Sequence, residues 1–479
     1  MPKTGFRTAL PYEDNFQLTA GDLRKVLDIA LSRGGDFAEI YLGYEHFSLV
    51  HMEEDIIKET AETIAQGMGI RVLCGDQTGY GYTSDLAPEK IRKTALTAAS
   101  IASGGARSGP GRIETVKIKH NVSLVSLPAH KTSLEKKINL VREAYASAQS
   151  FSPEVKKVKV SFQDSLEYVL VINSEGRLAR DVRPLVKLVS MVIAEKNTKR
   201  EFGFCGGGGR VGMEYFENTL TAREIGKEAA REALLLLGAV DAPAGEMPIV
   251  LSPGHSGVLI HEAVGHLLEA DFNRKKTSIF WNKMGKKVGS EQVTIYDDPT
   301  IPLFRGSYNI DDEGTVPYKT LLIDKGVVRG LLQDKLSARL MNGKPTGHGR
   351  RQDFGHWPVP RMANTYIDRG EFAPDEILKS VKKGFYVDRL SGGQVEDSGK
   401  FTFSVSLGYL IEDGRLAAPV KQATLIGTNI DVLKNLSMVG SDLAFGLQTG
   451  TCSKEGQDVP VNDGCPTMKI SRMTVGGRK

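Results

Sequence analysis

Cysteine is scarce in this chain, which has only Cys74, Cys205, Cys452 and Cys465 among its 479 residues. No two of them form a CxxC pair, and so few cysteines in so long a chain cannot build a disulfide framework. We therefore expect free thiols, a reducing compartment and a cytoplasmic location.

Long apolar runs and an excess of one charge are also missing. The longest apolar stretch, ALLLLGAV at 233–240, is far shorter than a membrane-spanning helix, and the first residues show no apolar core of a signal peptide. Lys and Arg total 62 against 58 Asp and Glu, and this small excess cannot create the broad basic field that non-specific nucleic-acid binding needs. We expect neither a membrane nor a nucleic acid as partner.

The remaining composition is that of a globular protein, with 40% hydrophobic and 25% charged residues. The length indicates two or three domains. The patterns predict an α+β fold, with an N-terminal mixed α/β domain over 1–240 and a C-terminal domain over 241–479. The segment DAPAGEMP at 241–248 marks the boundary, and the second domain is predicted to be mainly antiparallel β with a metal-binding helix.

Local signals predict several elements of the first half. Asp22 is expected to cap a first helix, and Pro88 to open another. The segment 67–85 indicates two short strands around a polar turn. Alternating apolar residues from Val158 onward, interrupted by Asn173–Gly176, predict a long antiparallel hairpin.

Two further helices are expected around the boundary. Thr221 and Glu224 form a capping box for a helix that should end at Gly238 in a left-handed cap. Ser252 is expected to cap the next helix, with Pro253 at its first position. Turns at 324–326 and 412–414 then connect predicted antiparallel strands.

The most informative motif is His261-Glu262-Ala263-Val264-Gly265-His266, inside the helix expected after Ser252. It differs from HExxH, because in a regular α-helix positions i and i+4 lie about 40° apart whereas i and i+5 lie about 140° apart. Two histidines at the wider spacing reach one metal only if the helix is locally distorted. A π-type turn near Gly265 would bring them together, since glycine has no side chain to resist it.

This interpretation assigns Glu262 as the general base for a water activated by the metal. The alternative is a buried helix with two hydrogen-bonded histidines and no metal. Two histidines also leave the site incomplete, because catalytic zinc usually has three protein ligands and one open position. The residues themselves leave the third ligand open, and the candidates are Glu269, Asp271, His255, His348, His356 and a distant cysteine. Cys452 lies in a glycine-flanked turn beside Lys454, which favours a thiolate.

A second cluster, GHGRRQDFGHWPVPRMAN at 347–364, combines forked donors with stiffening prolines. Arg350, Arg351, Arg361 and Asn364 could hold a peptide backbone or carboxylate there, or the segment could be a solvated basic loop. Gly207, Gly209 and Gly212 satisfy GxGxxG, but without a strand-then-helix context we interpret them as a mobile loop.

Three motifs together carry a family resemblance: HEAVGHLLEADF at 261–272, GHGRRQDFGHWPVPRMANTYI at 347–367 and GTCSKEGQ at 450–457. In this order they resemble the catalytic, TldD-like branch of the TldD/PmbA metalloproteases, and residues 67–85 resemble that family's first domain. The resemblance implies one zinc ion per active subunit, bound by His261, His266 and Cys452, with Glu262 as base.

The resemblance also implies a dimer that encloses a cavity and cleaves unstructured peptides. The dimer would form with a second copy or with a paralogous subunit. Backbone pairing of the peptide along a strand edge would explain a weak sequence preference. The alternative function is a non-catalytic peptide-binding or regulatory subunit with a structural metal, which a closed shell of four protein ligands would favour.

Overall fold

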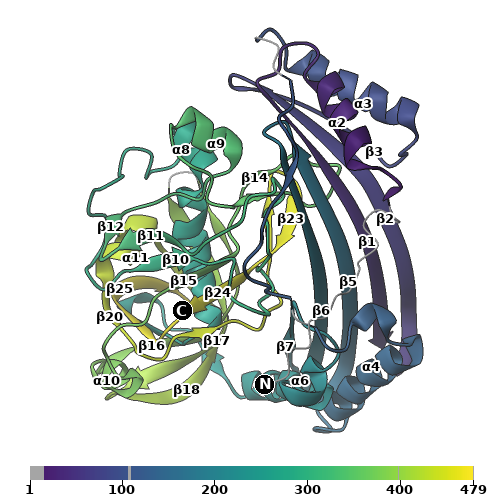
Figure 1. The fold of residues 1–479 in the computed structure, drawn as a ribbon. Coiled ribbons are helices and arrows are strands. Elements are labelled where there is room, and N and C mark those ends of the chain that lie inside the picture. The colour runs from purple at the N-terminus through teal and green to yellow at the C-terminus, as the bar shows by residue number, and fades with distance from the viewer. Residues whose placement is uncertain (1–15, 106–108, 124, 397–398, 478–479) are drawn as a thin grey trace, which may run out of the picture.

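The computed structural model describes residues 16–105, 109–123, 125–396 and 399–477. A long, strongly curved sheet forms one side of the molecule, and the β-rich second half of the chain lies against its inner face (Figure 1). The predicted α+β class and the mainly antiparallel second half are confirmed.

The first sheet has seven strands in the order β3-β2-β1-β5-β6-β4, with β7 also paired to β6. All its pairs are antiparallel except β4 with β6. The strands are β1 (Phe37–Glu53), β2 (Ile56–Cys74), β3 (Gln77–Thr83), β4 (Glu114–Thr115), β5 (Val155–Asn173), β6 (Arg177–Lys196) and β7 (Lys199–Gly209).

The predicted hairpin of β5 and β6 is confirmed, and its turn is held by Asn173, whose Oδ1 accepts hydrogen bonds from the backbone N–H groups of Glu175 and Arg177. The turn at Gly75 is confirmed as well, but the strand before it has 19 residues and is not short. Its length follows from continuous pairing with β1, which a local pattern does not reveal.

Helices cover the outer face of this sheet at both ends (Figure 1). At one end α2 (Ala20–Ala30) and α3 (Pro88–Ile101) pack on β1, β2 and β5, and at the other α4 (Leu134–Gln149) and α6 (Ala222–Leu237) pack on β5 and β6. Successive side chains of β1 alternate between the faces, so Ile40 contacts the helices while Tyr41 points to the second half of the chain. Two short helical segments, η1 (Ala129–Lys131) and α5 (Tyr215–Asn218), complete this part.

The helix termini confirm some expectations and correct others. The capping box of Thr221 and Glu224 is present. Asp22 is not the N-cap, because Thr19 caps α2 and Asp22 is the third residue of its capping box. Gly238 ends α6 with φ −93°, so the expected left-handed cap is wrong.

Of the three motif glycines, Gly207 and Gly209 do not lie in the expected loop, whereas Gly212 lies in an irregular segment after β7. Gly207 and Gly209 belong to β7, which pairs with β6 through Gly209. The glycines allow close approach, because a Cβ on Gly209 would lie 2.5 Å from the carbonyl oxygen of Leu303. Close packing of β7 against the segment at Leu303 therefore explains the glycine at 209.

A second sheet of eight strands forms the body of the C-terminal half. Five of its strands close into a ring in the order β16-β9-β25-β19-β17, because β17 also pairs with β16. The ring strands are β9 (Gly245–Leu251), β16 (Lys383–Val395), β17 (Lys400–Glu412), β19 (Ala423–Thr428) and β25 (Met468–Gly476); the others are β8 (Val240–Asp241), β18 (Arg415–Lys421) and β20 (Leu436–Val439).

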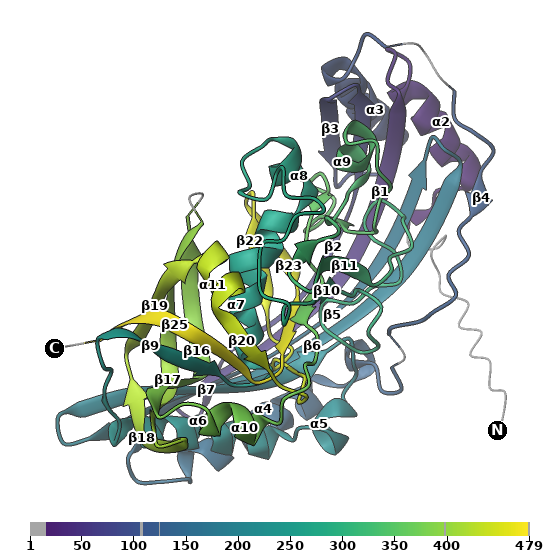
Figure 2. The ribbon, with the colours of Figure 1, turned by 90° about the vertical axis from the view of Figure 1, so that its left-hand side faces the viewer.

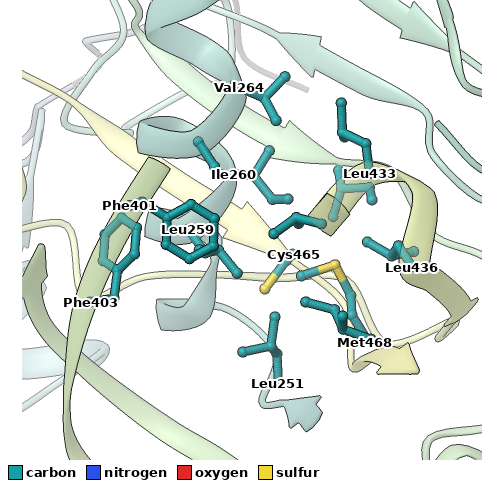
Figure 3. Packing of buried hydrophobic residues seen from close by; sticks show 14 of the residues in the cluster. Leu251, Leu259, Ile260, Val264, Phe401, Phe403, Leu433, Leu436, Cys465 and Met468 are labelled. Atoms are coloured by element: carbon teal, nitrogen blue, oxygen red, sulfur yellow. The ribbon is translucent and has the colours of Figure 1, made fainter. Parts of the chain in front are cut away.

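A buried helical segment packs inside this half. It consists of η2 (His255–Gly257), α7 (Val258–Ile260), η3 (His261–Gly265) and η4 (His266–Leu268). Leu259, Ile260 and Val264 lie among side chains of β17, α11 (Asn429–Asn435) and β25 (Figure 3). The tight packing fixes the orientation of the segment that carries the two motif histidines.

The start of this segment differs from expectation. Ser252 is not its N-cap, because Ser252 Oγ donates to the carbonyl of Asp388, and Gly254 with φ +81° separates Pro253 from the first helical turn. The helical turns begin at His255 instead.

Smaller elements surround the helical segment (Figure 2). A six-stranded sheet has the order β12-β11-β10-β15-β24-β21, and two hairpins pair β13 with β14 and β22 with β23. Their strands are β10 (Ile295–Asp297), β11 (Thr320–Asp324), β12 (Val327–Val328), β13 (Gly349–Arg350), β14 (Val359–Pro360), β15 (Asn364–Ile367), β21 (Ala444–Phe445), β22 (Thr451–Lys454), β23 (Gln457–Pro460) and β24 (Asn462–Cys465). The remaining helices are α8 (Ala270–Arg274), α9 (Lys335–Leu340) and α10 (Pro374–Lys379).

The chain passes from the first sheet to the C-terminal half between α6 and β9, close to the predicted boundary at 240. A division into two domains there stays a prediction. In the described part of the chain, none of the helices combines the length and hydrophobicity needed to span a membrane.

Buried ion pairs connect the first sheet to the C-terminal half. Glu39 of β1 lies 2.7 Å from Arg351 and 3.0 Å from Arg71, and Arg71 also pairs with Glu313. All four side chains are buried, so each charge depends on its partners for the stabilisation that water would otherwise give.

Replacing Arg351 by alanine should therefore destabilise the protein by about 3–5 kcal/mol, because it leaves Glu39 buried with one of its guanidinium partners removed. Urea denaturation measures the change, with Arg33→Ala as control because Arg33 is exposed. Equal unfolding midpoints for the two variants would show that the Glu39–Arg351 pair does not hold the two parts together.

Candidate metal centre

The helix that carries the motif contains a π-helical turn over His261–Gly265, as the spacing predicted. The backbone N–H of His266 donates to the carbonyl of His261, a five-residue span that replaces the α-helical four. This extra residue in one turn brings the two imidazoles together, with ring centroids 5.1 Å apart.

Gly265 provides the space that the turn needs. A Cβ at this position would lie 2.0 Å from the sulfur of Met362, which packs against the helix. The neighbouring residues Ala263 and Val264 are fully buried. Packing of the helix against Met362 thus depends on glycine at 265.

Cys452 is the third member of the cluster. It lies on β22, in the hairpin with β23, and its Sγ is 3.4 Å from His266 Nε2. Ligand atoms of His261, His266 and Cys452 all lie within 4.8 Å of one another. Among the described residues this is the one group of three or more potential ligands with such spacing.

Each imidazole is oriented by a carboxylate. Asp463 Oδ1 lies 2.7 Å from His261 Nδ1, and Glu269 Oε2 lies 3.1 Å from His266 Nδ1. A carboxylate at Nδ1 fixes the ring and leaves Nε2 free to bind a metal. The donor set of two imidazoles and one thiolate suits zinc better than magnesium or calcium.

The electrostatics of the cluster favour an ionised thiol. Burial raises the pKa of Cys452, but the two neighbouring histidines outweigh it and hold that pKa well below its usual value. Burial lowers the pKa of His266, whereas Glu269 and Cys452 raise it to about 10. A bound metal cation could replace the extra protons on the histidines and would neutralise the charges of the Cys452 thiolate and the neighbouring carboxylates.

The other ligand candidates have other partners. Asp271 binds the ammonium group of Lys454 at 2.8 Å, and His255 Nε2 lies 3.0 Å from the carbonyl oxygen of Leu390. His348 lies between Thr346 and Asp297, and His356 contacts Asp353.

Glu262 lies at the edge of a cavity of about 330 Å³. Its side chain is 33% exposed, and its Oε2 lies 3.8 Å from His266 Nε2. The carboxylate therefore reaches both the cavity and the cluster.

The four residues predicted to bind substrate are buried elsewhere. Arg350 donates to the carbonyls of Met362 and Pro460, and Arg361 donates to those of Cys452 and Gln457. Arg351 belongs to the ion pairs with the first sheet, and Asn364 Nδ2 donates to Ser307 Oγ and to the carbonyl of Asp298. Through Arg361 this group contacts the strand that carries Cys452.

The sequence did not reveal Asp463 or the contacts of Lys454, which it had marked only as a neighbour of Cys452 that favours a thiolate. Asp463 follows the cysteine by eleven positions on a different strand, and no local pattern marks it. Lys454 Nζ lies 3.0 Å from Glu269 and 2.8 Å from Asp271, linking the cysteine strand to the carboxylate that orients His266. The sequence offered one indication of this role: Cys452 and Lys454 are two positions apart on a strand, so their side chains point to the same face.

The buried cluster and its carboxylates form a potential metal site of the kind found in metal-binding proteins, and comparisons with known proteins identify the family. Sequence models match residues 244–477 as a PmbA/TldA metallopeptidase C-terminal domain, 128–237 as its central domain and 38–102 as its domain 1.

Relatives match over nearly the whole chain. A "Metalloprotease TldD homolog" of Haemophilus influenzae is 42% identical, with 96% of this chain and 97% of that protein covered. A "Metalloprotease" of Methanothermobacter thermautotrophicus is 34% identical, with 92% and 96% covered. The chain belongs to the TldD/PmbA family, and the names of its relatives indicate a metalloprotease.

Solved structures share the fold. A putative modulator of a DNA gyrase from Thermotoga maritima aligns with a TM-score of 0.79 at 22% identity, covering 95% of this chain and 99% of that one. TldE from Thermococcus kodakarensis aligns with a TM-score of 0.73 at 19% identity, covering 95% and 100%.

Replacing Gly265 by alanine should lower the free energy of unfolding by about 1–3 kcal/mol, because the methyl group overpacks against Met362. We expect zinc affinity to fall as well, since the helix must shift. Combining Gly265→Ala with Met362→Ala should cost less than the sum of the single changes, because the contact is removed. Strict additivity in a double-mutant cycle would contradict the packing role of Gly265.

Proposed function

We propose that this protein is a zinc-dependent peptidase that cleaves unstructured peptides, with one zinc ion per active subunit. The observation that carries the proposal is the convergence of His261, His266 and Cys452 beside the partly exposed carboxylate of Glu262. A relative from Saccharolobus solfataricus named "Zinc metalloprotease TldD homolog", 25% identical with 95% of this chain and 99% of that protein covered, supports zinc.

Three side chains would bind the ion, through Nε2 of His261 and His266 and Sγ of Cys452. When bound, zinc supplies a Lewis acid that lowers the pKa of water toward neutrality. Asp463 and Glu269 hold the imidazoles in the orientation that this binding requires.

Glu262 would act as the general base. Its carboxylate faces the cavity, so an oxygen of Glu262 can accept a proton from the attacking water and later donate it to the nitrogen of the leaving amine.

The alternative function, a non-catalytic subunit with a structural metal, would need a fourth protein ligand. Glu269 and Asp271 are the nearest carboxylates considered for it, but both hold Lys454, and Glu269 also contacts Nδ1 of His266. Because both carboxylates already bind Lys454, they favour a metal site whose fourth position is open. An open position favours catalysis over a purely structural role.

A role for Arg350, Arg351, Arg361 and Asn364 in substrate binding stays a prediction. Their contacts support an indirect role, in which the buried guanidinium groups hold the loops and strands that border the site. The four free cysteines agree with the proposed cytoplasmic location.

We further propose that the active form is a dimer, either of two copies or with a paralogous subunit. The likeness to the structure of TldE supports a paralogue as partner. Light scattering should give twice the mass of 52.2 kDa for an active homodimer. A preparation that is monomeric alone should gain activity when the paralogue is added, and full activity of a monomer would contradict the proposal.

Glu262→Gln and Cys452→Ser should separate chemistry from metal binding. The first keeps all three ligands, so zinc should stay bound while turnover falls about 10²- to 10⁴-fold. The second replaces a thiolate by a poorer ligand, so zinc itself should be lost or weakened. Zinc content and peptide cleavage are measured on both, and normal cleavage by Glu262→Gln with zinc bound would exclude the assigned base.

A further inference from the structure

The cavity beside Glu262 has an apolar wall. Leu267, Phe272 and Val395 line it, on three separate elements that meet next to His266. Its volume of about 330 Å³ leaves room for a large side chain.

The hydroxyl groups that line the cavity have partners within the protein. Ser278 Oγ donates to the carbonyl of Leu267 at 2.6 Å, and Thr277 Oγ1 donates to that of Phe272 at 3.2 Å. Ser453 Oγ donates to the carboxylate of Asp458. A polar side chain entering the cavity would have to compete with these bonds.

The one lysine in the lining, Lys454, has its charge neutralised by partners within the protein. Lys454 Nζ contacts Glu269 at 3.0 Å, Asp271 at 2.8 Å and the carbonyl of Pro360 at 3.0 Å. These three acceptors match the three protons of an ammonium group. The side chain is 4% exposed, so Lys454 offers no free charge to a ligand.

We propose that this cavity is a specificity subsite that binds an apolar side chain of the one peptide residue next to the scissile bond, so that the weak sequence preference expected from backbone pairing applies to the other positions of the peptide. The inference rests on the proposed function, because the cavity lies beside the general base and the ligand His266. An apolar side chain loses no hydrogen bonds on entering, whereas an acidic one would meet the carboxylates of Glu262 and Glu396 at the same cavity.

The first test is a set of unstructured peptides that differ only at the residues flanking the expected cut. We expect mass spectrometry to place cleavage next to Leu, Met or Phe at one fixed side of the bond. The value of kcat/KM should be at least about tenfold higher for Leu than for Ala, and lower still for Asp. Cleavage without any preference at either flanking position would overturn the subsite but leave the peptidase function standing.

The second test fills the cavity. Val395→Trp should reduce kcat/KM for the Leu peptide about tenfold or more, while the Ala peptide and the zinc content change little. Thr277→Trp serves as a second variant, because Thr277 is exposed and its replacement does not disturb the core.

Val240→Trp is the matched control, because Val240 is 42% exposed on β8 and does not line the cavity. Equal losses for the Leu and Ala peptides in both cavity variants would overturn the subsite. If the folded, zinc-loaded protein cleaves no peptide at all, the proposed function fails and the subsite fails with it.

Discussion

The extra residue in one helical turn is the constraint on which the centre depends. Histidines five positions apart diverge on a regular α-helix, and the π-turn over His261–Gly265 brings their rings to a centroid distance of 5.1 Å. Such a turn is less stable than regular helix, so the surroundings must hold it. The closed ring of five strands buries the segment, and the packing of Met362 against Gly265 leaves no room for a side chain there.

A second level of organisation sets the chemistry of the cluster. Asp463 and Glu269 are hydrogen-bonded to Nδ1 of His261 and His266. Lys454, on the same strand as Cys452, forms an ion pair with Glu269. The orienting groups thus connect the helical segment at 261–269 to two neighbouring strands, β22 and β24, that lie about two hundred residues further along the chain. These contacts place Asp463 and Glu269 at the Nδ1 atoms of the two rings, on the side away from Nε2, and Glu262 lines the neighbouring cavity.

The sequence predicted the parts of the site that follow from helix geometry and from donor chemistry. The spacing of His261 and His266 was enough to predict the π-turn. The third ligand was not determined by spacing, because Cys452 reaches the cluster through strand pairing far along the chain. The role of Arg350, Arg351 and Arg361 along a peptide path stays a prediction. Their burial could not be predicted, since a sequence does not show which carbonyls and carboxylates will meet a guanidinium group. The glycines of 207–209 were misinterpreted for a similar reason, because their neighbour Leu303 is remote.

The central claim, an open catalytic zinc centre with one cysteine ligand, is tested most directly by X-ray absorption at the zinc edge of the zinc-loaded protein. Such a centre should show one sulfur at about 2.3 Å, two imidazole nitrogens at about 2.0–2.1 Å and one further oxygen that an added inhibitor can replace. Absence of sulfur from the zinc shell, or a fourth ligand from the protein that no inhibitor displaces, would contradict it.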